Sequence, residues 1–592
     1  MVYDYADSLV KIKDTGRASD HGVLFLKPLS PNISCAVVLQ RKKSERVRFN
    51  SGFTRYLLLP GMRHFVLSRI QINALRLNPI AVRAREPMDS AKKRKAQAAG
   101  EEPNSKAGRN HLETATPLSL ELREAHLPSV LTLLVIAETH ALLSSRVFSD
   151  IDPKGYAAGV ASGAEKEFET ENQHVVLFVL PNASSRHNSS SKAYAVNAFM
   201  KGKKKLLNSS KSIGILVLAS SKYHAYAQVA EISRHFPYFS MKSSERARGS
   251  VHVIVDFPDM HQDFLLTQHV MDGIRLCQYL VDSPPNILNV NRYVEECQQV
   301  AARTAANIEV IRGEQLRDQG FGGIWAVGAA SVELPAIVVL SHIPAEATAG
   351  TKSVCLVGKG IVFDTGGLSV KISGGMVGMK RDMGGSAAIL AAFEAIVKSK
   401  SCKRPLYAIL CIAENSISSM STRPDDIITM YSKKTVEINN IDAEGRLVLA
   451  DGCSYAHRHL NPSHIIDMAT LTGAQGVSTG KRHGAIYTNC EELEGKAVLS
   501  GRVSGDLVHP MPYCPEFFAR EFDSECADMT NSVADRTNAQ VSCAAQFVGN
   551  HIEGFVEEGG RWLHIDMAYP VYSGERATGY GVALLYDLVN SL

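Results

Sequence analysis

The sequence predicts an α/β fold whose C-terminal half is built on a mostly parallel central sheet with helices on both faces. Short apolar runs, each followed by glycine-rich or acidic residues, occupy 354–363, 406–413, 436–439 and 465–469. Between them, 386–398 and 447–459 carry apolar side chains at three- and four-residue spacing, which predicts helices. Strand, loop and helix in repetition are typical of parallel sheets with both faces covered.

A second, smaller α/β domain is predicted ahead of this one. Its strand-like apolar runs are 129–137, 174–180, 213–218 and 251–256. We therefore expect an N-terminal α/β domain over residues 112–271 and a larger C-terminal α/β/α domain over residues 272–592.

Residues 1–111 are an unassigned extension that ends in a polar linker. Apolar patches in its first part follow no clean period, and 87–110 are too rich in small and polar side chains to offset the entropy cost of ordering them. The run Lys92–Lys95 has the composition of a nuclear-import or nucleic-acid patch. A solvated stretch of charge is the commoner meaning of such a run, and we adopt that interpretation.

Composition and charge exclude several classes of protein. The 592 residues carry 64 Lys and Arg against 60 Asp and Glu, and the net charge of +4 indicates no nucleic-acid or membrane-surface partner. Eleven cysteines without a Cys-x-x-Cys pair indicate neither a disulfide framework nor a thiolate zinc site. The first residues do not resemble a secretory signal, and runs such as 130–137 are far shorter than the roughly 20 residues that cross a bilayer. We expect a cytoplasmic protein without a membrane partner.

Three consecutive segments deliver carboxylates to one predicted edge of the C-terminal sheet. The acidic residues that end strands or precede helices there are Asp364, Asp382, Asp442 and Glu444. Converging carboxylates repel one another unless a cation compensates, because burying unpaired charge is costly. Oxygen-rich sites suit Mg, Mn or Zn, and a shared carboxylate can bridge two ions about 3.5–4 Å apart. A divalent metal site is the simplest interpretation.

Two lysines, Lys359 and Lys371, flank the first of these carboxylates. A lysine can join a metal site only as a neutral amine, which requires a pKa lowered by burial and by nearby metal charge. Each of these residues alone would more often be a cap, a turn former or a surface charge. Their combination and spacing favour metal chemistry.

Three segments carry a family resemblance: Gly358–Gly367, Asp382–Gly385 and, above all, Asn440–Leu447. They resemble the leucine aminopeptidases, the dizinc family of cytosolic leucyl aminopeptidase. Further segments resemble the animal probable aminopeptidase-like branch, namely Met379–Asp382, Thr435–Asn439 and Asp467–Gln475. The resemblance implies a macro-like fold for the N-terminal α/β domain and a metallo-aminopeptidase catalytic domain over 272–592.

The resemblance also implies an activity, the release of leucine-like, neutral N-terminal residues from peptides by water that two metals activate. The two divalent ions would be Zn, or Mn or Mg at an exchangeable site, held by Lys359, Asp364, Asp382, Asp442 and Glu444. Asp364 and Glu444 would bridge the ions. Lys371 would polarise the scissile carbonyl and stabilise the developing charge, and Arg446 would hold a bicarbonate ion as general base.

Substrate recognition and assembly follow from the same resemblance. Residues that match the pocket for the first side chain are Met379, Thr470, Gly473 and Ala568. An apolar pocket would favour leucine-like residues, with each missing methylene changing discrimination by about 1–3 kcal/mol. The family is hexameric, which implies a homo-hexamer that acts on peptides in their catabolism.

Ile441 departs from the family signature, which has Thr between Asn440 and Asp442. Because this position is not a ligand, we expect the chemistry to survive the change. We expect the loop to lose one hydrogen bond.

Two alternatives compete with this interpretation. Residues 476–480 match the Gly-x-Ser-x-Gly nucleophile elbow of serine hydrolases, with His564 as a downstream base. An elbow should follow its strand at once, whereas 470–475 intervene here. The other alternative is a catalytically weak scaffold or nucleic-acid-binding hexamer; the intact ligand set argues against it, and salt-dependent DNA retention would reveal it.

Overall fold

The computed structural model describes residues 21–25, 36–40 and 116–592, the last with gaps at 124–129, 131, 139–164, 171–172, 209–210, 244–248 and 349. The chain divides into two compact units, Met1–Gly100 and Glu101–Leu592. In the first unit, β1 (His21–Phe25) pairs antiparallel with β2 (Ala36–Gln40). The remaining predictions for 1–111, including the one for Lys92–Lys95, lie outside the described residues.

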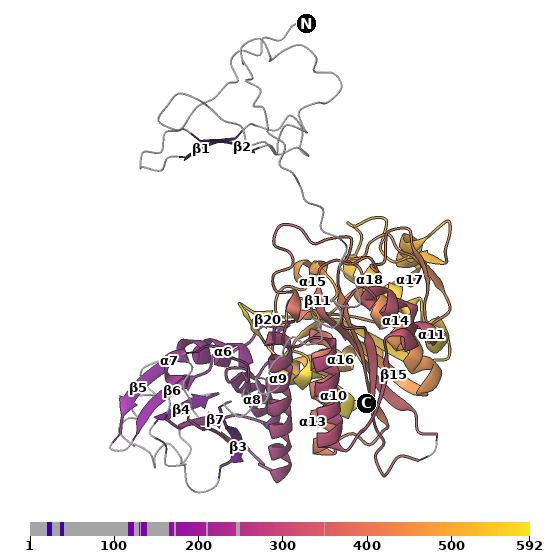
Figure 1. The fold of residues 1–592 in the computed structure, drawn as a ribbon. Helices are drawn as coiled ribbons and strands as arrows, with labels where there is room; N and C mark the ends of the chain where they lie inside the picture. The colour runs from indigo at the N-terminus through magenta and orange to yellow at the C-terminus, as the bar shows by residue number, and fades with distance from the viewer. Residues whose placement is uncertain are drawn as a thin grey trace, which may run out of the picture. The chain divides into compact units, whose positions relative to one another are not determined.

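A six-stranded sheet forms the N-terminal part of the second unit (Figure 1). Its order is β3 (Leu118–Leu122), β8 (Val251–Asp256), β7 (Ile213–Leu218), β4 (Thr132–Ala137), β6 (His174–Val179) and β5 (Glu165–Glu169). The first five run parallel and β5 pairs antiparallel at the edge. The four apolar runs predicted as strands are β4, β6, β7 and β8, which confirms them. The edge strand β5 was not predicted because its sequence is mostly charged and contains no apolar run. Charged side chains are typical of edge strands, where they oppose pairing with another chain.

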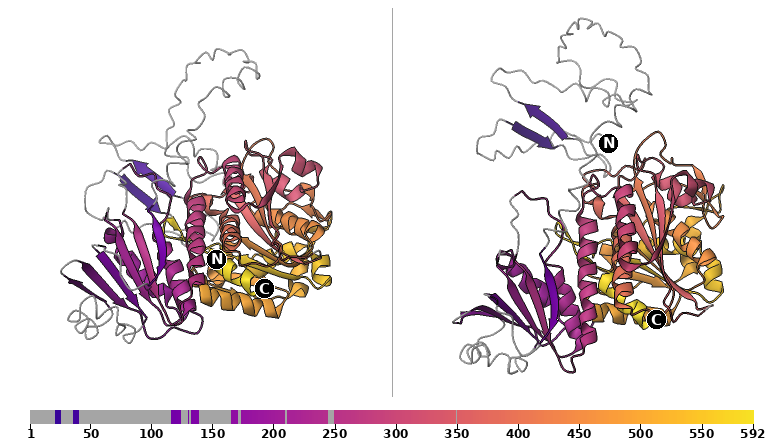
Figure 2. Two further views of the ribbon diagram at one scale, coloured as in Figure 1. Left: turned by 90° about the horizontal axis from the view of Figure 1, so that it is seen from below. Right: turned by 60° about the horizontal axis from the view of Figure 1, so that its bottom comes forward.

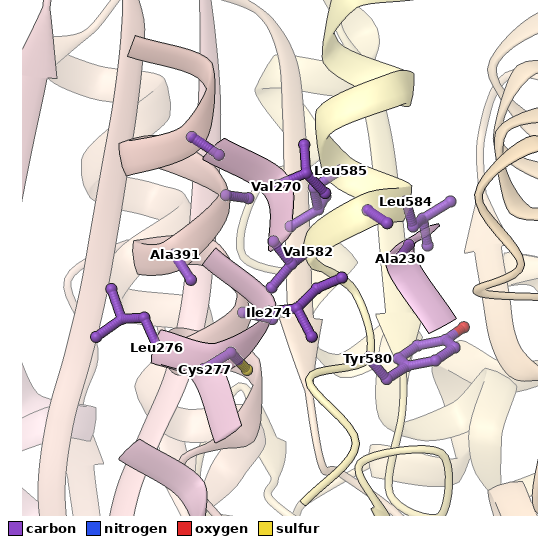
Figure 3. Packing of buried hydrophobic residues seen from close by; sticks show 14 of the residues in the cluster. Ala230, Val270, Ile274, Leu276, Cys277, Ala391, Tyr580, Val582, Leu584 and Leu585 are labelled. Carbon is purple, nitrogen blue, oxygen red and sulfur yellow. The ribbon is translucent and has the colours of Figure 1, made fainter. Parts of the chain in front are cut away.

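Helices connect this sheet to the rest of the second unit. They are α6 (Ala193–Gly202), α7 (Lys204–Leu207), α8 (Lys222–Ser233), η1 (Gln262–Leu266) and α9 (Thr267–Asp282). Figure 3 shows Val270 and Ile274 of α9 beside Ala391 of α13 (Gly384–Ser399) and Val582 of α20 (Val582–Ser591). These side chains belong to one continuous buried cluster that also takes in the N-terminal sheet, so the two sheets share a core.

The C-terminal part is built on an eight-stranded sheet. Its order is β17 (Val508–Pro510), β16 (Gly484–Thr488), β19 (Arg561–Asp566), β15 (Pro462–Ala469), β11 (Ser353–Asp364), β12 (Leu406–Asn415), β10 (Ala336–His342) and β9 (Asn307–Arg312). The central strands β19, β15, β11 and β12 run parallel, whereas β10, β9 and the β16–β19 pair are antiparallel. The prediction of an α/β fold with mostly parallel sheets is confirmed.

The remaining elements surround this sheet. The helices are α10 (Val290–Thr304), α11 (Glu314–Asp318), α12 (Gly322–Gly328), η2 (Met379–Arg381), α14 (Gly445–His459), α15 (Gly473–Ser478), α16 (Glu491–Ser504), α17 (Pro515–Phe518), η3 (Ala519–Phe522), α18 (Gln540–Gly549) and α19 (Glu553–Glu557). Two small sheets comprise β13 (Ile427–Thr429), β14 (Thr435–Glu437) and β18 (Met529–Thr530), and β20 (Tyr572–Ser573) with β21 (Arg576–Ala577). The helices predicted over 386–398 and 447–459 lie within α13 and α14, which confirms them.

One predicted strand lies elsewhere than expected. Of the run 436–439, the first two residues belong to β14 in the small three-stranded sheet, and none belongs to the central sheet. Val436 is buried there between half-buried Thr435 and Glu437. The interior strands of the central sheet, β11, β12, β15 and β19, are six to twelve residues long and largely buried, and three-residue β14 is too short for such a position.

The central strand β11 shows why both faces of the sheet are covered. Val354 and Leu356 point into the cluster that contains α13, whereas Cys355 and Val357 point into the cluster that contains α14. This is the alternation of side chains along a strand, with both sides apolar. Figure 2 shows helices on the two sides of this sheet.

The parallel strands end at one edge of the sheet. Asp364 ends β11, Asn415 ends β12 and Ala469 ends β15. Ligands of open α/β sheets bind outside these carboxyl ends, so the site is expected here. Among the described residues, no helix has the length and apolarity needed to cross a membrane.

Candidate metal centre

Three buried carboxylates meet at the carboxyl edge of the central sheet. Asp364 ends β11, Asp382 lies between η2 and α13, and Glu444 directly precedes α14. One oxygen of each lies within 4.8 Å of an oxygen of the others. Asp442 lies further out, with its side chain 36% exposed. The predicted edge therefore brings three of the four acids into one cluster and leaves the fourth at its rim.

Both predicted lysines contact these acids. Lys359 Nζ lies 2.8 Å from Asp382 Oδ1 and 2.8 Å from Glu444 Oε1, and it also donates to the carbonyl oxygen of Thr470. Lys371 Nζ lies 2.7 Å from Asp364 Oδ2. The second ion pair of Lys371 is with Asp442 Oδ1, at 2.5 Å.

The charges in this cluster shift one another's pKa values. Burial alone would lower the pKa of Lys359, but Asp382 and Glu444 raise it above the ordinary value. Burial raises the pKa of Asp382 well above the ordinary value, although Lys359 opposes that effect. Burial and the neighbouring Glu444 also raise the pKa of Asp364. The site therefore holds more negative charge than burial tolerates without cations.

Asn415 orients the central carboxylate, a role that the sequence did not reveal. Its Nδ2 donates to Asp364 Oδ1 at 2.8 Å and to the carbonyl oxygen of Ile441 at 3.2 Å. The backbone N–H of Gly366 donates to the same oxygen, Asp364 Oδ1, at 2.8 Å. Because both donors bind Oδ1, the other oxygen of Asp364 faces Lys371.

Asn531 fixes the loop that carries Asp442 and Glu444. Its Oδ1 accepts the backbone N–H groups of Asn439 and Asn440, and its Nδ2 donates to the carbonyl oxygens of Asn440 and Ala443. The carbonyl oxygen of Asn531 accepts Arg446 Nη1 at 3.0 Å. No motif marks Asn531, which lies far along the chain in the segment after β18.

Arg446 is the predicted bicarbonate holder. Its Nε is buried without a hydrogen-bond partner among the described residues. Burial lowers the pKa of Arg446 to about 10 even though Glu444 raises it, so the guanidinium is cationic near neutral pH.

The departure at Ile441 is absorbed by packing. Its side chain is buried against Gly367, where a Cβ would lie only 2.3 Å from Ile441 Cγ2. Gly367 also has a positive φ of 55°. Both this backbone conformation and the close contact with Ile441 favour glycine at this position. The backbone N–H of Ile441 donates to Ser369 Oγ at 3.0 Å. The loop therefore keeps backbone hydrogen bonds at this position.

Of the four residues predicted to bind substrate, Thr470 has a hydrogen bond to a carboxylate of the cluster. Thr470 is buried and donates to Asp382 Oδ1 at 2.9 Å. Met379 is half-buried in η2, and Gly473 begins α15 with open space where its Cβ would be. Ala568 follows β19, and its N–H donates to Asp566 at 3.2 Å.

Asp566 connects the loops that carry these residues, and sequence reasoning missed it. It accepts hydrogen bonds from the backbone N–H groups of Leu471, Thr472 and Ala568. The segments that follow β15 and β19 are thus joined through one buried carboxylate. Its signal in the sequence is only an acid that ends an apolar run.

Comparison with known proteins agrees with this geometry. The model of the "Cytosol aminopeptidase family, catalytic domain" matches residues 275–586. This chain belongs to the cytosol aminopeptidase family. The mouse "Probable aminopeptidase NPEPL1" is 46% identical over 421 residues, which are 69% of this chain and 78% of that protein. "Leucine aminopeptidase 1" of Caenorhabditis elegans is 44% identical over 418 residues, 70% of this chain and 83% of that protein.

Solved structures of cytosol aminopeptidases share the fold. The C. elegans leucine aminopeptidase has a TM-score of 0.74 and 38% identity, and the match covers 80% of this chain and 98% of that one. The leucyl aminopeptidase from Trypanosoma brucei in complex with bestatin has a TM-score of 0.75 and 32% identity, with 83% and 100% covered. The predicted family is confirmed, and the protein is a metal-dependent aminopeptidase, a peptidase of the hydrolase class.

The residues of this cytosol aminopeptidase fit a bound metal. Asp382 Oδ2 and Glu444 Oε2 are buried and have no hydrogen-bond partner among the described residues. Unpartnered buried carboxylate oxygens are costly unless a cation binds them. Gly445 makes room for the Lys359 side chain beside them, because a Cβ there would lie 2.8 Å from Lys359 Nζ.

The serine hydrolase alternative is wrong for this family member. Ser478 ends α15, is exposed and donates to the carbonyl oxygen of Ala474. His564 is fully buried and binds Asp467 Oδ1 through Nδ1 at 2.5 Å. In the described part of the chain, no hydrogen bond joins Ser478 to His564.

Proposed function

We propose that this aminopeptidase releases neutral, leucine-like N-terminal residues from peptides at a centre of two divalent ions. The ligands in this proposal are Lys359, Asp364, Asp382, Asp442 and Glu444. The observation that carries the proposal is a pair of buried oxygens, one on Asp382 and one on Glu444, for which the described residues supply no hydrogen-bond partner. When bound, the ions supply Lewis-acid activation of water and of the scissile carbonyl.

Asp364 and Glu444 would be the ligands shared by the two ions. The Oδ1 atom of Asp364 is fixed by Asn415, which leaves Oδ2 to face the centre. Glu444 offers Oε1 beside Lys359 and an unpartnered Oε2. Glu444 would therefore offer two oxygens to the centre once Lys359 loses its proton, whereas Asp364 would offer Oδ2 alone.

Lys371 is the proposed electrophilic residue. The pKa of Lys371 is raised because Asp364 and Asp442 outweigh burial, which on its own would lower it. The group therefore stays an ammonium and can donate hydrogen bonds to a carbonyl oxygen that gains negative charge. Such a preorganised donor stabilises the transition state more than the ground state.

Arg446 is the proposed holder of the general base. Its guanidinium donates through Nη1 to the carbonyl oxygen of Asn531, and its Nε has no hydrogen-bond partner in the part of the chain that the structure describes. A small planar anion such as bicarbonate matches two adjacent guanidinium donors. Held there, it would take the proton of the attacking water.

Met379, Thr470, Gly473 and Ala568 are the proposed lining of the pocket for the first side chain. The open space at Gly473 supports room for a branched apolar group. The ions we propose are Zn, or Mn or Mg at the exchangeable site. Further parts of the proposal are the domain division at 112–271 and 272–592, a homo-hexamer and a cytoplasmic location.

Hydrolysis of a leucine anilide tests this function. Purified protein is assayed as isolated, after chelation, and after Zn or Mn is restored, with N-acetyl-leucine anilide as the control substrate. We expect activity that chelation removes, metal restores and N-acetylation blocks. Cleavage of the acetylated substrate, or no cleavage under any metal, would contradict the proposal.

A further inference from the structure

A second cluster of reactive side chains lies at the carboxyl edge of the N-terminal six-stranded sheet. Glu138 directly follows β4, Ser190 lies in the segment between β6 and α6, and His224 lies in the first turn of α8. Ser190 Oγ lies 2.8 Å from His224 Nε2. His224 Nδ1 contacts Glu138 Oε1. The order hydroxyl, imidazole, carboxylate is that of a nucleophile, its general base and the group that orients the base.

The hydrogen bonds around Glu138 assign its protonation state. Glu138 is 1% exposed and accepts the backbone N–H of Ser220 at 2.6 Å and Lys192 Nζ at 3.1 Å. Burial raises the pKa of Glu138, but hydrogen bonds from His224, Ser220 and Lys192 outweigh burial and lower it to about 2. The carboxylate is therefore ionised near neutral pH and can only accept.

This assigns the tautomer of His224. Because Glu138 can only accept, Nδ1 carries the imidazole proton and donates it to the carboxylate. In the neutral ring, Nε2 is then an acceptor, and the hydroxyl of Ser190 donates to it. Ser220 Oγ, 3.0 Å from Nδ1, is a second acceptor for the same N–H.

Helix capping does not account for this arrangement. The cap of α8 is Ser221, whose side chain accepts the backbone N–H of His224, and α6 has no side-chain cap. The neighbouring Ser189 differs from Ser190, since it is buried and donates to the carbonyl oxygen of Arg502. Ser190 is exposed and directs its hydroxyl to an imidazole instead of to backbone.

We propose that Ser190 is an activated nucleophile that accepts acyl groups from small activated esters, a reaction separate from peptide hydrolysis. Ser190 Oγ forms a bond to the ester carbonyl carbon, and the bond from that carbon to the alkoxy oxygen breaks. His224 Nε2 takes the hydroxyl proton and returns it to the departing alcohol. Glu138 is a positioning residue that holds the tautomer and stabilises the imidazolium.

An alkyl fluorophosphonate probe tests the proposal, because it traps activated serines as the Ser190 Oγ–P bond forms and fluoride leaves. Full-length protein is labelled before and after chelation, and the modified peptide is located by mass spectrometry. The variants are Ser190→Ala, His224→Gln and Glu138→Gln. Ser185→Ala is the matched control, since Ser185 is exposed in the same segment. Circular dichroism and leucine anilide hydrolysis report folding.

We expect labelling at Ser190 that survives chelation and disappears in Ser190→Ala, with aminopeptidase activity unchanged in that variant. A general base contributes about 10²-fold or more, so His224→Gln should lower the labelling rate at least about tenfold while Ser185→Ala leaves it unchanged. Equal labelling of Ser185 and Ser190, or an unchanged rate in folded His224→Gln, would overturn the proposal. Because His224 is partly exposed, that variant decides the question even where Glu138→Gln unfolds.

Discussion

The two parallel sheets of this protein use the same edge for different chemistry. At the central sheet, three acids share two lysines, and one oxygen each of Asp382 and Glu444 has no hydrogen-bond partner among the residues that the structure describes. At the N-terminal sheet, one acid, Glu138, has a surplus of donors around it. The ratio of carboxylates to donors decides the outcome, because excess negative charge recruits a cation and a satisfied carboxylate orients its neighbour.

The largest effect is expected from Lys371→Met, which removes the proposed electrophile and keeps most of the side chain's volume. The value of kcat should fall by about 10²–10³, the usual cost of one preorganised donor, while the carboxylates still bind metal. Steady-state kinetics with leucine anilide and metal analysis check this. Lys352→Met alters an exposed lysine and is the control. A variant with unchanged kcat would remove Lys371 from the reaction.

A smaller effect is expected from Asn415→Ala, which releases Asp364 Oδ1 from its side-chain donor. Outer partners of metal ligands contribute about 10–100-fold to affinity or activity. Metal affinity, measured by competition with a chelator, should weaken by that factor.

Asn489→Ala is the matched control, since among the described residues the Asn489 side chain hydrogen-bonds only to the backbone of Gly560 and Trp562. Equal losses in the folded Asn489 and Asn415 variants would mean that Asn415 acts through stability alone.

The smallest effect concerns how the free energy of unfolding depends on pH, which His551 in the C-terminal part and Glu138 at the N-terminal sheet change over different pH ranges. Burial and Lys434 lower the pKa of His551 to about 3, although Asp528 opposes them. Between pH 6.5 and 3 the unfolded imidazole binds a proton that the folded one does not, so stability falls as the pH drops through this window. The pKa of Glu138 is lowered to about 2 from 4.5, so its contribution is lost only below pH 4.5.

His551→Gln should therefore flatten the dependence of unfolding free energy on pH between 7 and 5. The change in slope is at most about 1.4 kcal/mol per pH unit, the value of one proton. Urea unfolding of both proteins at several pH values measures it. Parallel pH profiles for the two proteins would contradict the assignment.

The site residues that could be predicted from the sequence are those with a signal in their own segment. Asp364, Asp382 and Glu444 each stand at the end of an apolar run or directly before a helix, so their convergence followed from the topology of a parallel sheet. Asn415, Asn531 and Asp566 lie in segments remote from their partners and carry no motif. Their roles depend on tertiary contacts that periodicity does not encode.

Two further features of the structure were not predicted because they also depend on tertiary contacts. The antiparallel strands β9 and β10 have no special pattern, because strand direction is set by connections and not by composition. The cluster at Ser190 joins three unremarkable polar segments that only the folding of the N-terminal sheet brings together.

Metal stoichiometry shows directly whether the centre holds two ions. Protein stripped by a chelator is titrated with Zn or Mn, freed of excess ion, and analysed for metal per chain, with Glu444→Gln alongside. We expect two bound ions in the wild type and a loss of binding in Glu444→Gln, which lacks the charge of the shared carboxylate. Failure of the wild type to bind metal, or full binding by the variant, would contradict it.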